Sequence, residues 1–332
     1  MENFKSDQGD MLNVFITVDT EIWCDGWNDL DRKFPKYFKS YVYGPTSDGN
    51  FALPGTLSIL EEYNLPAVFF VEPLFSERFG IEPLKEMVGL LQEKNQEIQL
   101  HMHPEWVDEV GDRLLPGIRK KIPNMTRCTQ EQQSQLIRWA IQRMHEAGVS
   151  HINAFRAGGF CANRATLHAV AENHLVFDSS YNLSGPIGVA DIAPGELLHQ
   201  PRYIDNVYEY PLSVIKDPIR RNYRNVQINA LSLAELIHCL ETGFEEAWDS
   251  VVIVTHNFEL LSRDKTKVDK IVRKRFQRFC QYLDNNRDRF NVRGFRDLVP
   301  KDIQPQPPVV SGNLIPAGLR YAEQALRELL YH

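Results

Sequence analysis

Short runs of β-branched and aromatic residues recur along the chain and alternate with longer amphipathic segments. A short apolar run bounded by turn residues predicts a buried strand, whereas apolar positions that repeat every three or four residues predict a helix. The predicted strands cover residues 12–18, 67–71, 97–103, 151–156, 176–178, 207–212, 251–255 and 290–295. The predicted helices cover residues 54–63, 82–94, 129–147, 164–173, 232–248, 266–284 and 316–331. This alternation predicts a parallel sheet whose strands are joined by helical crossovers.

Two segments depart from the alternation. Residues 22–52 contain aromatic, glycine and charged residues without a clear period, and long ordered loops are usually functional. We interpret this segment as a wall of the active site, with a small aromatic core as the alternative. From residue 301 onward, several prolines indicate a linker before the last predicted helix. The sequence therefore predicts a barrel domain over residues 1–300. A linker and an amphipathic helix follow over 301–332, with the helix packing on the body or on a partner chain.

Composition narrows the class of protein. The chain has 332 residues, 43% of them hydrophobic, which is enough to bury one large core. A net charge of −7 argues against a general nucleic-acid binder. The five cysteines are odd in number and widely scattered, which favours reduced thiols over a disulfide framework. The amino terminus does not resemble a signal peptide, and no apolar run approaches the roughly 20 residues of a membrane helix. We therefore expect a cytoplasmic protein without a membrane span.

Side chains suited to catalysis stand at the carboxyl ends of four predicted strands. They are Asp19 and Glu21, His101 and His103, Arg156, and His256. The carboxyl ends of parallel strands share one face of a barrel, where catalytic residues gather. Residues i and i+2 of a strand point to the same side, so His101 and His103 present both imidazoles to one point. Two imidazoles with a carboxylate suit zinc and similar divalent ions. An open sheet would also bring these ends together, but their spread over distant strands favours a barrel.

Several short stretches carry a resemblance to a known family. They are Thr17-Val18-Asp19-Thr20-Glu21, Ala67-Val68-Phe69-Phe70-Val71, Glu97-Ile98-Gln99-Leu100-His101, Phe155-Arg156-Ala157-Gly158-Gly159-Phe160, Asp178-Ser179-Ser180 and Val254-Thr255-His256. In order and spacing they resemble the polysaccharide deacetylase family (NodB homology, carbohydrate esterase family 4) over residues 12–298. The resemblance implies a distorted (β/α) barrel of about seven parallel strands. It also implies a divalent metal, usually zinc, and removal of an N-acetyl group from a sugar.

The resemblance also implies a role for each matching residue. Asp19 matches the catalytic base, Arg156 the arginine that orients it, and His256 the histidine that acts as general acid. His101 matches the first metal histidine, and Glu21 stands where the family has its metal-binding acid. We expect Arg156 to hold Asp19 through a bidentate, charge-assisted contact.

Two departures from the family pattern leave the metal set open. The two acids are adjacent in most members, whereas Thr20 separates them here, a spacing that some branches share. The second metal histidine usually lies four residues after the first, and that position is Glu105. Either His103 or Glu105 completes the set, and we favour His103 because two imidazoles and one carboxylate are a well-precedented zinc set. A site that works without metal is a further alternative.

Other residues near these motifs are candidates for contact with substrate. They are Glu105, Trp106, Gly158 and Phe160. Trp106 could form a sugar-stacking wall with Trp23 and Trp27, because aromatic rings pack on apolar faces, although ordinary core packing is the equal alternative. The pair Gly158-Gly159 is more typical of a tight turn than of a phosphate site. Three further residues could bind a phosphate on a carrier-linked sugar or form a solvated loop, namely Arg220, Arg221 and Arg224.

The leading hypothesis is a metal-dependent hydrolase that removes an N-acyl group, acetyl by the resemblance, from an amino sugar in polysaccharide biosynthesis. Zinc is the expected metal and a carbohydrate is the expected partner. Nucleic acid is not expected, and a homo-oligomer stays open. Two alternatives remain, which are a metal-independent hydrolase of a non-sugar C–N bond and a non-catalytic barrel that binds glycan.

Overall fold

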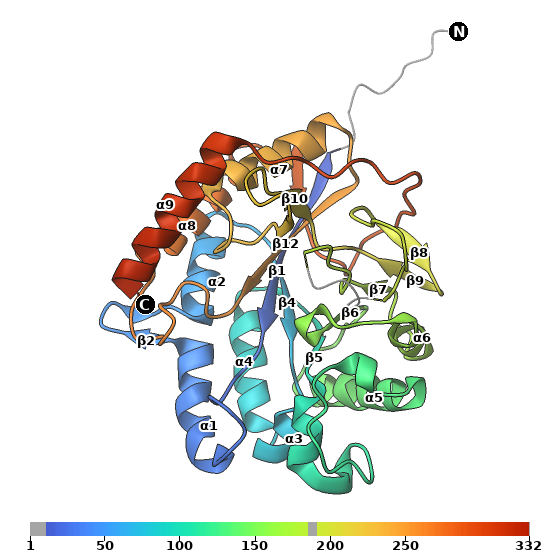
Figure 1. The fold of residues 1–332 in the computed structure, drawn as a ribbon. Helices are drawn as coiled ribbons and strands as arrows, with labels where there is room; N and C mark the ends of the chain where they lie inside the picture. Colours follow the sequence, from blue (N-terminus) through green and yellow to red (C-terminus); the bar gives the residue numbers. More distant parts are fainter. Residues whose placement is uncertain (1–10, 185–190, 332) are drawn as a thin grey trace.

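The computed structural model describes residues 11–184 and 191–331, and one curled sheet forms its centre (Figure 1). The strands lie in the order β12-β1-β4-β5-β6-β7-β9-β8, and β13 also pairs with β1. Their bounds are β1 Leu12–Thr20, β4 Val68–Val71, β5 Glu97–Met102, β6 Ala154–Ala157, β7 Phe177–Asp178, β8 Arg202–Ile204, β9 Val207–Glu209, β12 Ser250–His256 and β13 Phe290–Val292. Every pairing in this sheet is parallel except that of β8 with β9. The predicted fold class, a distorted α/β barrel of mostly parallel strands, is confirmed.

Strand β1 shows how the sheet divides its side chains between two faces. Val14 and Ile16 belong to the large core beneath the helices, whereas Phe15 belongs to a smaller apolar cluster inside the barrel. Alternate residues of a strand point to the same side, so Thr17 and Asp19 share the inner face with Phe15. The inner face of β1 therefore carries the apolar Phe15 in its middle and the polar Thr17 and Asp19 toward its carboxyl end, where the predicted site lies.

Helices surround the outer side of the curled sheet (Figure 1). They are α1 Leu30–Phe38, α2 Leu53–Glu62, α3 Ser76–Phe79, α4 Glu82–Glu93, α5 Gln130–Glu146, α6 Arg164–Glu172, α7 Leu233–Glu245, α8 Lys270–Asp284 and α9 Leu314–Tyr331, with short 3-10 helices at η2 Pro104–Arg113, η3 Met125–Arg127 and η4 Gly158–Phe160. A capping box starts α5, in which the Thr129 hydroxyl accepts from the Gln132 backbone N–H and the Gln132 side chain accepts from that of Thr129. Among the described residues, no helix is both long enough and apolar enough to cross a membrane.

Residues 22–52 are more regular than their sequence predicts. Helix α1 continues into a π-helix, η1 (Lys39–Tyr43), and a small hairpin of β2 (Pro45–Thr46) and β3 (Gly49–Asn50) follows. The change from α to π winding and Pro35 inside α1 break the helical period, so the sequence of this segment does not show a helical pattern. Phe34 stacks on Phe79 with ring centroids 3.7 Å apart. An aromatic core, the alternative interpretation of this segment, is therefore present.

The strands β9 and β12 do not pair, and a segment with little regular structure lies between them in space. It includes an antiparallel hairpin of β10 (Val214–Lys216) and β11 (Tyr223–Asn225), which the sequence did not predict because each strand has only three residues. The Ser213 N–H donates to the Val252 carbonyl at 3.0 Å, and the Val254 N–H donates to the Val226 carbonyl at 3.1 Å. These bonds satisfy the backbone of β12 on the side that no regular strand covers.

Helix α9 packs on the body through buried charges. Arg320 is 1% exposed, donates to Asp217 at 2.7 Å and donates to Glu235 at 3.2 Å. Asp217 also accepts from Arg224 at 2.5 Å. Arg224, one of the candidate phosphate contacts, is therefore engaged in holding this corner of the fold.

Candidate active site

Strand ends bring the predicted catalytic residues together. The register of β1 against β12 sets Asp19 opposite His256. The register of β5 against β6 sets His101 opposite Arg156. Because these strands are parallel and all lie in one curled sheet, their carboxyl ends meet at one mouth of the barrel.

Glu21, His101 and His103 form a compact cluster of potential metal ligands. Glu21 Oε2 lies 2.8 Å from His103 Nε2 and 3.6 Å from His101 Nε2. The two imidazole Nε2 atoms are 3.1 Å apart. All three residues are buried, and one ligand atom from each lies within 4.8 Å of the others. The cluster thus directs three donor atoms at one point.

The structure distinguishes the two candidates for the third position. His103 joins Glu21 and His101 through Nε2, whereas Glu105 Oε2 lies 3.3 Å from the opposite ring nitrogen, His103 Nδ1. A carboxylate behind an imidazole orients the ring and makes it a stronger donor. His101 is held in the same way, because its Nδ1 donates to the carbonyl of Arg156 at 2.9 Å and leaves Nε2 facing Glu21.

The charges of the cluster fit a divalent cation. Burial alone would raise the pKa of Glu21, but the histidines, foremost His103, lower it well below its usual value. Burial alone would lower the pKa of His103, but Glu21 and Glu105 raise it to about 10. Two carboxylates on one buried imidazole therefore favour a positive charge at this point. A metal ion could supply this positive charge in place of the proton on His103, because the imidazoles that bind a metal are neutral and the carboxylates are ionised.

Arg156 is fully buried and positions Asp19. Its Nη1 donates to Asp19 Oδ1 at 2.6 Å and to the Thr17 hydroxyl at 2.8 Å. Its other nitrogens donate to the carbonyl and the hydroxyl of Ser179, each at 2.9 Å. The guanidinium also lies over the ring of Phe70, 4.2 Å from the centroid. Arg156 therefore meets Asp19 through one nitrogen, and the expected bidentate contact is replaced by a network that fixes the guanidinium in several directions.

His256 has a buried carboxylate partner, Glu259, that no sequence pattern predicts. His256 Nδ1 lies 2.8 Å from Glu259 Oε1, and Glu259 also accepts from the Thr255 hydroxyl at 2.9 Å and from Gln227 at 2.5 Å. Burial would lower the pKa of His256, but the hydrogen bond and charge of Glu259 raise it to about 9. The His256 side chain is 24% exposed, so it can meet a ligand that enters from solvent.

Two further polar residues at the site carry weak sequence signals. Glu72 directly follows β4, is 1% exposed and has a pKa raised to about 8 by burial. Asn257 follows His256 and braces the loop after β1, because its side chain contacts both the N–H and the carbonyl of Glu21 at 3.3 Å. Each comes immediately after a predicted strand end, which is the only signal that could have marked them.

Gly158 is placed where no side chain fits. A Cβ on Gly158 would lie 2.5 Å from Cε1 and Nδ1 of His103.

We expect Gly158→Ala to displace His103 and to lower metal affinity by about 10- to 100-fold. Isothermal titration with zinc checks this. Gly89→Ala is the matched control, because a Cβ at Gly89 in α4 meets nothing within 4 Å. Equal zinc affinity in Gly158→Ala and wild type would contradict the assignment of His103.

The aromatic residues near the site divide into core and surface. Trp106 is 1% exposed and packs edge-on against Trp27 at 4.8 Å and Phe79 at 6.0 Å. Its ring is part of the core, and this burial argues against sugar stacking. Trp23 is half-buried and stands edge-on to His103, with ring centroids 4.7 Å apart. Phe160 is half-buried in the turn after β6 with a φ of 60°, and Gly158 belongs to the same turn.

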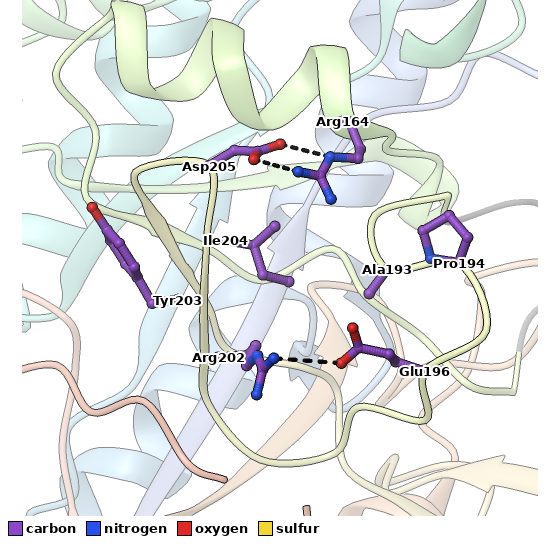
Figure 2. Close-up of a pocket in the computed structure, with 8 residues that line it drawn as sticks. All are labelled: Arg164, Ala193, Pro194, Glu196, Arg202, Tyr203, Ile204 and Asp205. Atoms are coloured by element: carbon purple, nitrogen blue, oxygen red, sulfur yellow. Dashed lines mark hydrogen bonds and ion pairs between the residues drawn. The ribbon is translucent and has the colours of Figure 1, made fainter. Parts of the chain in front are cut away.

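A separate surface pocket of about 350 Å³ lies beside α6 and the β8–β9 hairpin (Figure 2). Figure 2 shows its charged side chains joined in pairs, Arg164 with Asp205 and Arg202 with Glu196. The pocket shares no lining residue with the cluster at the barrel mouth. Because each guanidinium already faces a carboxylate, the pocket is not suited to capture of an anion.

Comparison with known proteins bears on the family and the fold. The sequence model of the polysaccharide deacetylase family matches residues 43–177, a range that contains His101, His103 and Arg156. No curated protein sequence matches the chain. A structure from Mycobacterium smegmatis, described as that of a candidate polysaccharide deacetylase, has a TM-score of 0.54 and 17% identity over 87% of this chain and 88% of that one. A family 4 carbohydrate esterase from Streptomyces lividans has a TM-score of 0.43 and 12% identity over 84% and 91% of the two chains.

The chain thus has an α/β-barrel fold, and its candidate site lies at the carboxyl ends of the strands. The match of the family model over residues 43–177 bears out the resemblance to the polysaccharide deacetylase family, and the structure from Mycobacterium smegmatis has a similar fold. Asp19, Glu21 and His256 lie outside the matched range of the family and are placed at the site by the fold.

Proposed function

We propose that this chain is a metal-dependent deacetylase that removes an N-acetyl group from an amino sugar. The observation that supports it most is the buried Glu21–His101–His103 cluster at the same barrel mouth as Asp19 and His256. Glu21, His101 and His103 would hold the ion, which supplies Lewis acidity for the acyl oxygen and makes a water molecule more acidic.

The chain's own residues account for the proton transfers. Asp19 takes a proton from the attacking water, whose oxygen adds to the acyl carbon. Arg156 keeps Asp19 in place through the 2.6 Å contact. His256 then gives its proton to the amide nitrogen as the C–N bond breaks, which yields acetate and a free amine. The proton held by Asp19 returns to His256 through solvent and completes the cycle.

The finer assignments rest on chemistry and on the resemblance. Zinc suits two imidazoles and one carboxylate. The five cysteines are all free, which supports a reducing, cytoplasmic setting. Glu105 and Phe160 border the site and remain the proposed substrate contacts, with Gly158 admitting the His103 ring. The setting in polysaccharide biosynthesis rests on the family resemblance alone.

A direct assay tests this function. Zinc-loaded protein is incubated with N-acetylglucosamine and with its oligomers, and acetate and free amine are quantified. We expect the two products in equal amounts. Sugar binding without acetate release would favour a non-catalytic glycan-binding barrel. Chelator-insensitive hydrolysis of simple amides would favour the metal-independent alternative.

The His256–Glu259 pair predicts a pH dependence. His256 must carry its proton to act as an acid, so activity is present below its pKa, about 9, and is lost as the pH rises through that value. Glu259→Gln removes the negative charge that raises the pKa of His256. We therefore expect the alkaline loss of kcat to move toward pH 6.5, the ordinary pKa of a histidine side chain. A pH profile of kcat checks this, with Glu246→Gln as the control at an exposed position. An unchanged alkaline limb would show that another group donates the proton.

A further inference from the structure

Helix α9 is oriented with its polar side inward. Arg320, Glu323 and Arg327 all contact the body, through Asp217 and Glu235, Arg275, and Asp269 respectively. In an ordinary surface helix the apolar stripe faces the core and the charged side faces water. The reverse arrangement leaves the apolar side of α9 exposed.

The exposed side of α9 is almost purely aliphatic. Of the twelve large hydrophobic residues that are exposed in the described part of the chain, six lie on this helix. They are Leu314 at 67%, Ile315 at 79%, Leu319 at 56%, Leu326 at 46%, Leu329 at 82% and Leu330 at 50% exposure. At 100° per residue, all except Leu314 fall within one third of the helix circumference. A contiguous apolar patch of this kind marks an interaction surface.

A row of cations borders the patch. Lys270, Lys274 and Arg278 are exposed and lie one turn apart along α8, which crosses beside α9 (Figure 1). A groove of about 430 Å³ between the two helices is lined by these three side chains and by Leu326. In the described part of the chain none of the three forms a salt bridge. The positive charge is confined to this part of the surface, because the whole chain has a net charge of −7.

We propose that the α9 leucine face and the α8 cation row together bind an anionic lipid surface. Exposed leucines beside lysine and arginine are the pattern of an element that lies in the membrane interface. There, apolar side chains enter the acyl boundary and cations contact lipid headgroups. The proposal is independent of the deacetylase function, because none of these residues belongs to the catalytic site.

A second copy of the chain fits this face less well. A two-fold interface pairs one patch with itself, so it must be self-complementary. The groove beside the three cations is lined by one carboxylate, Glu323, and Arg275 already engages it. Self-pairing would therefore bring two positively charged surfaces together, which is unfavourable.

Sedimentation with vesicles tests the proposal on the full chain. The probes are phosphatidylcholine vesicles and vesicles that contain about one third phosphatidylglycerol. We expect binding to the anionic vesicles alone, weakening as salt rises. The double variant Leu326→Gln/Leu329→Gln should bind at least about tenfold more weakly, and Lys274→Glu/Arg278→Glu should also lose at least about tenfold. The matched controls, Leu197→Gln and Lys120→Glu, change exposed residues elsewhere and should bind as the wild type does.

Two results would overturn the proposal. One is equal sedimentation of wild type and both double variants. The other is a dimer in analytical ultracentrifugation that the leucine double variant converts to a monomer, with no vesicle binding, which would show that α9 pairs two copies. All the variants should retain acetate release and thermal stability, because the changed side chains are exposed.

Discussion

Replacing Asp19 by Asn should reduce kcat for acetate release by a factor of about 100 to 10,000 while leaving zinc binding intact. The amide keeps an oxygen that can accept the Arg156 hydrogen bond, now 2.6 Å, but it cannot take a proton from water. Arg156 would then be a buried cation without its carboxylate, and we expect the melting temperature to fall by a few degrees. Steady-state kinetics and zinc titration on one preparation measure both effects.

Asp48→Asn is the control for this experiment, because Asp48 is exposed in the β2–β3 turn. Its kinetics should match those of the wild type. Activity of Asp19→Asn within a few fold of the wild type would exclude Asp19 as the base. Loss of zinc together with activity would instead assign Asp19 to the metal set.

Replacing His101 by Ala should remove the metal, the activity and the stability that the metal contributes. His101 Nε2 is one of three ligand atoms grouped within 4.8 Å, and two ligands hold an ion far more weakly than three. Excess zinc should stabilise the wild type by about 2.7 kcal/mol when its free concentration is 100 times the dissociation constant. We expect this stabilisation to disappear in His101→Ala and in wild type treated with a chelator.

Metal analysis and thermal unfolding with and without zinc check this prediction. His151→Ala is the matched control, because His151 is exposed. A His101→Ala protein that still binds one zinc per chain and releases acetate would refute the proposed metal set. Chelation that removes zinc from the wild type without loss of activity would refute metal dependence.

The two proton-transfer groups are kept apart although they face each other across two strands. Asp19 and His256 are register partners on β1 and β12, and a direct ion pair between them would neutralise both. Instead, Asp19 is held by Arg156 and His256 by Glu259. Glu259 therefore favours the protonated form of His256, and Arg156 fixes the position of Asp19. We expect a variant of Arg156 to slow proton abstraction by Asp19, and a variant of Glu259 to change proton donation by His256.

Much of the fold follows from local pattern. Parallel strands and crossover helices were predicted because buried strands read as continuous apolar runs and their helices are amphipathic. The start of α5 was predicted by the capping box at Thr129. The prediction failed for α1 and η1, where Pro35 and π winding disturb the period, and for β10 and β11, whose strands are too short to show one.

The sequence by itself determined which residues stand at the carboxyl ends of strands, and therefore that Asp19, His101, Arg156 and His256 would share one barrel mouth. Strand position is a local property, and the parallel topology converts it into proximity. Only the tertiary structure decided between His103 and Glu105 as neighbours of Glu21, because that choice depends on side-chain directions at a strand end.

The tertiary structure also decided the partners and the exposure of these side chains. Glu259 behind His256 and Ser179 around Arg156 depend on how loops and neighbouring strands pack. The burial of Trp106 and the exposure of the α9 leucines have the same origin. An amphipathic pattern defines two faces of a helix, but buried partners such as Asp217 and Glu235 determine which face turns inward.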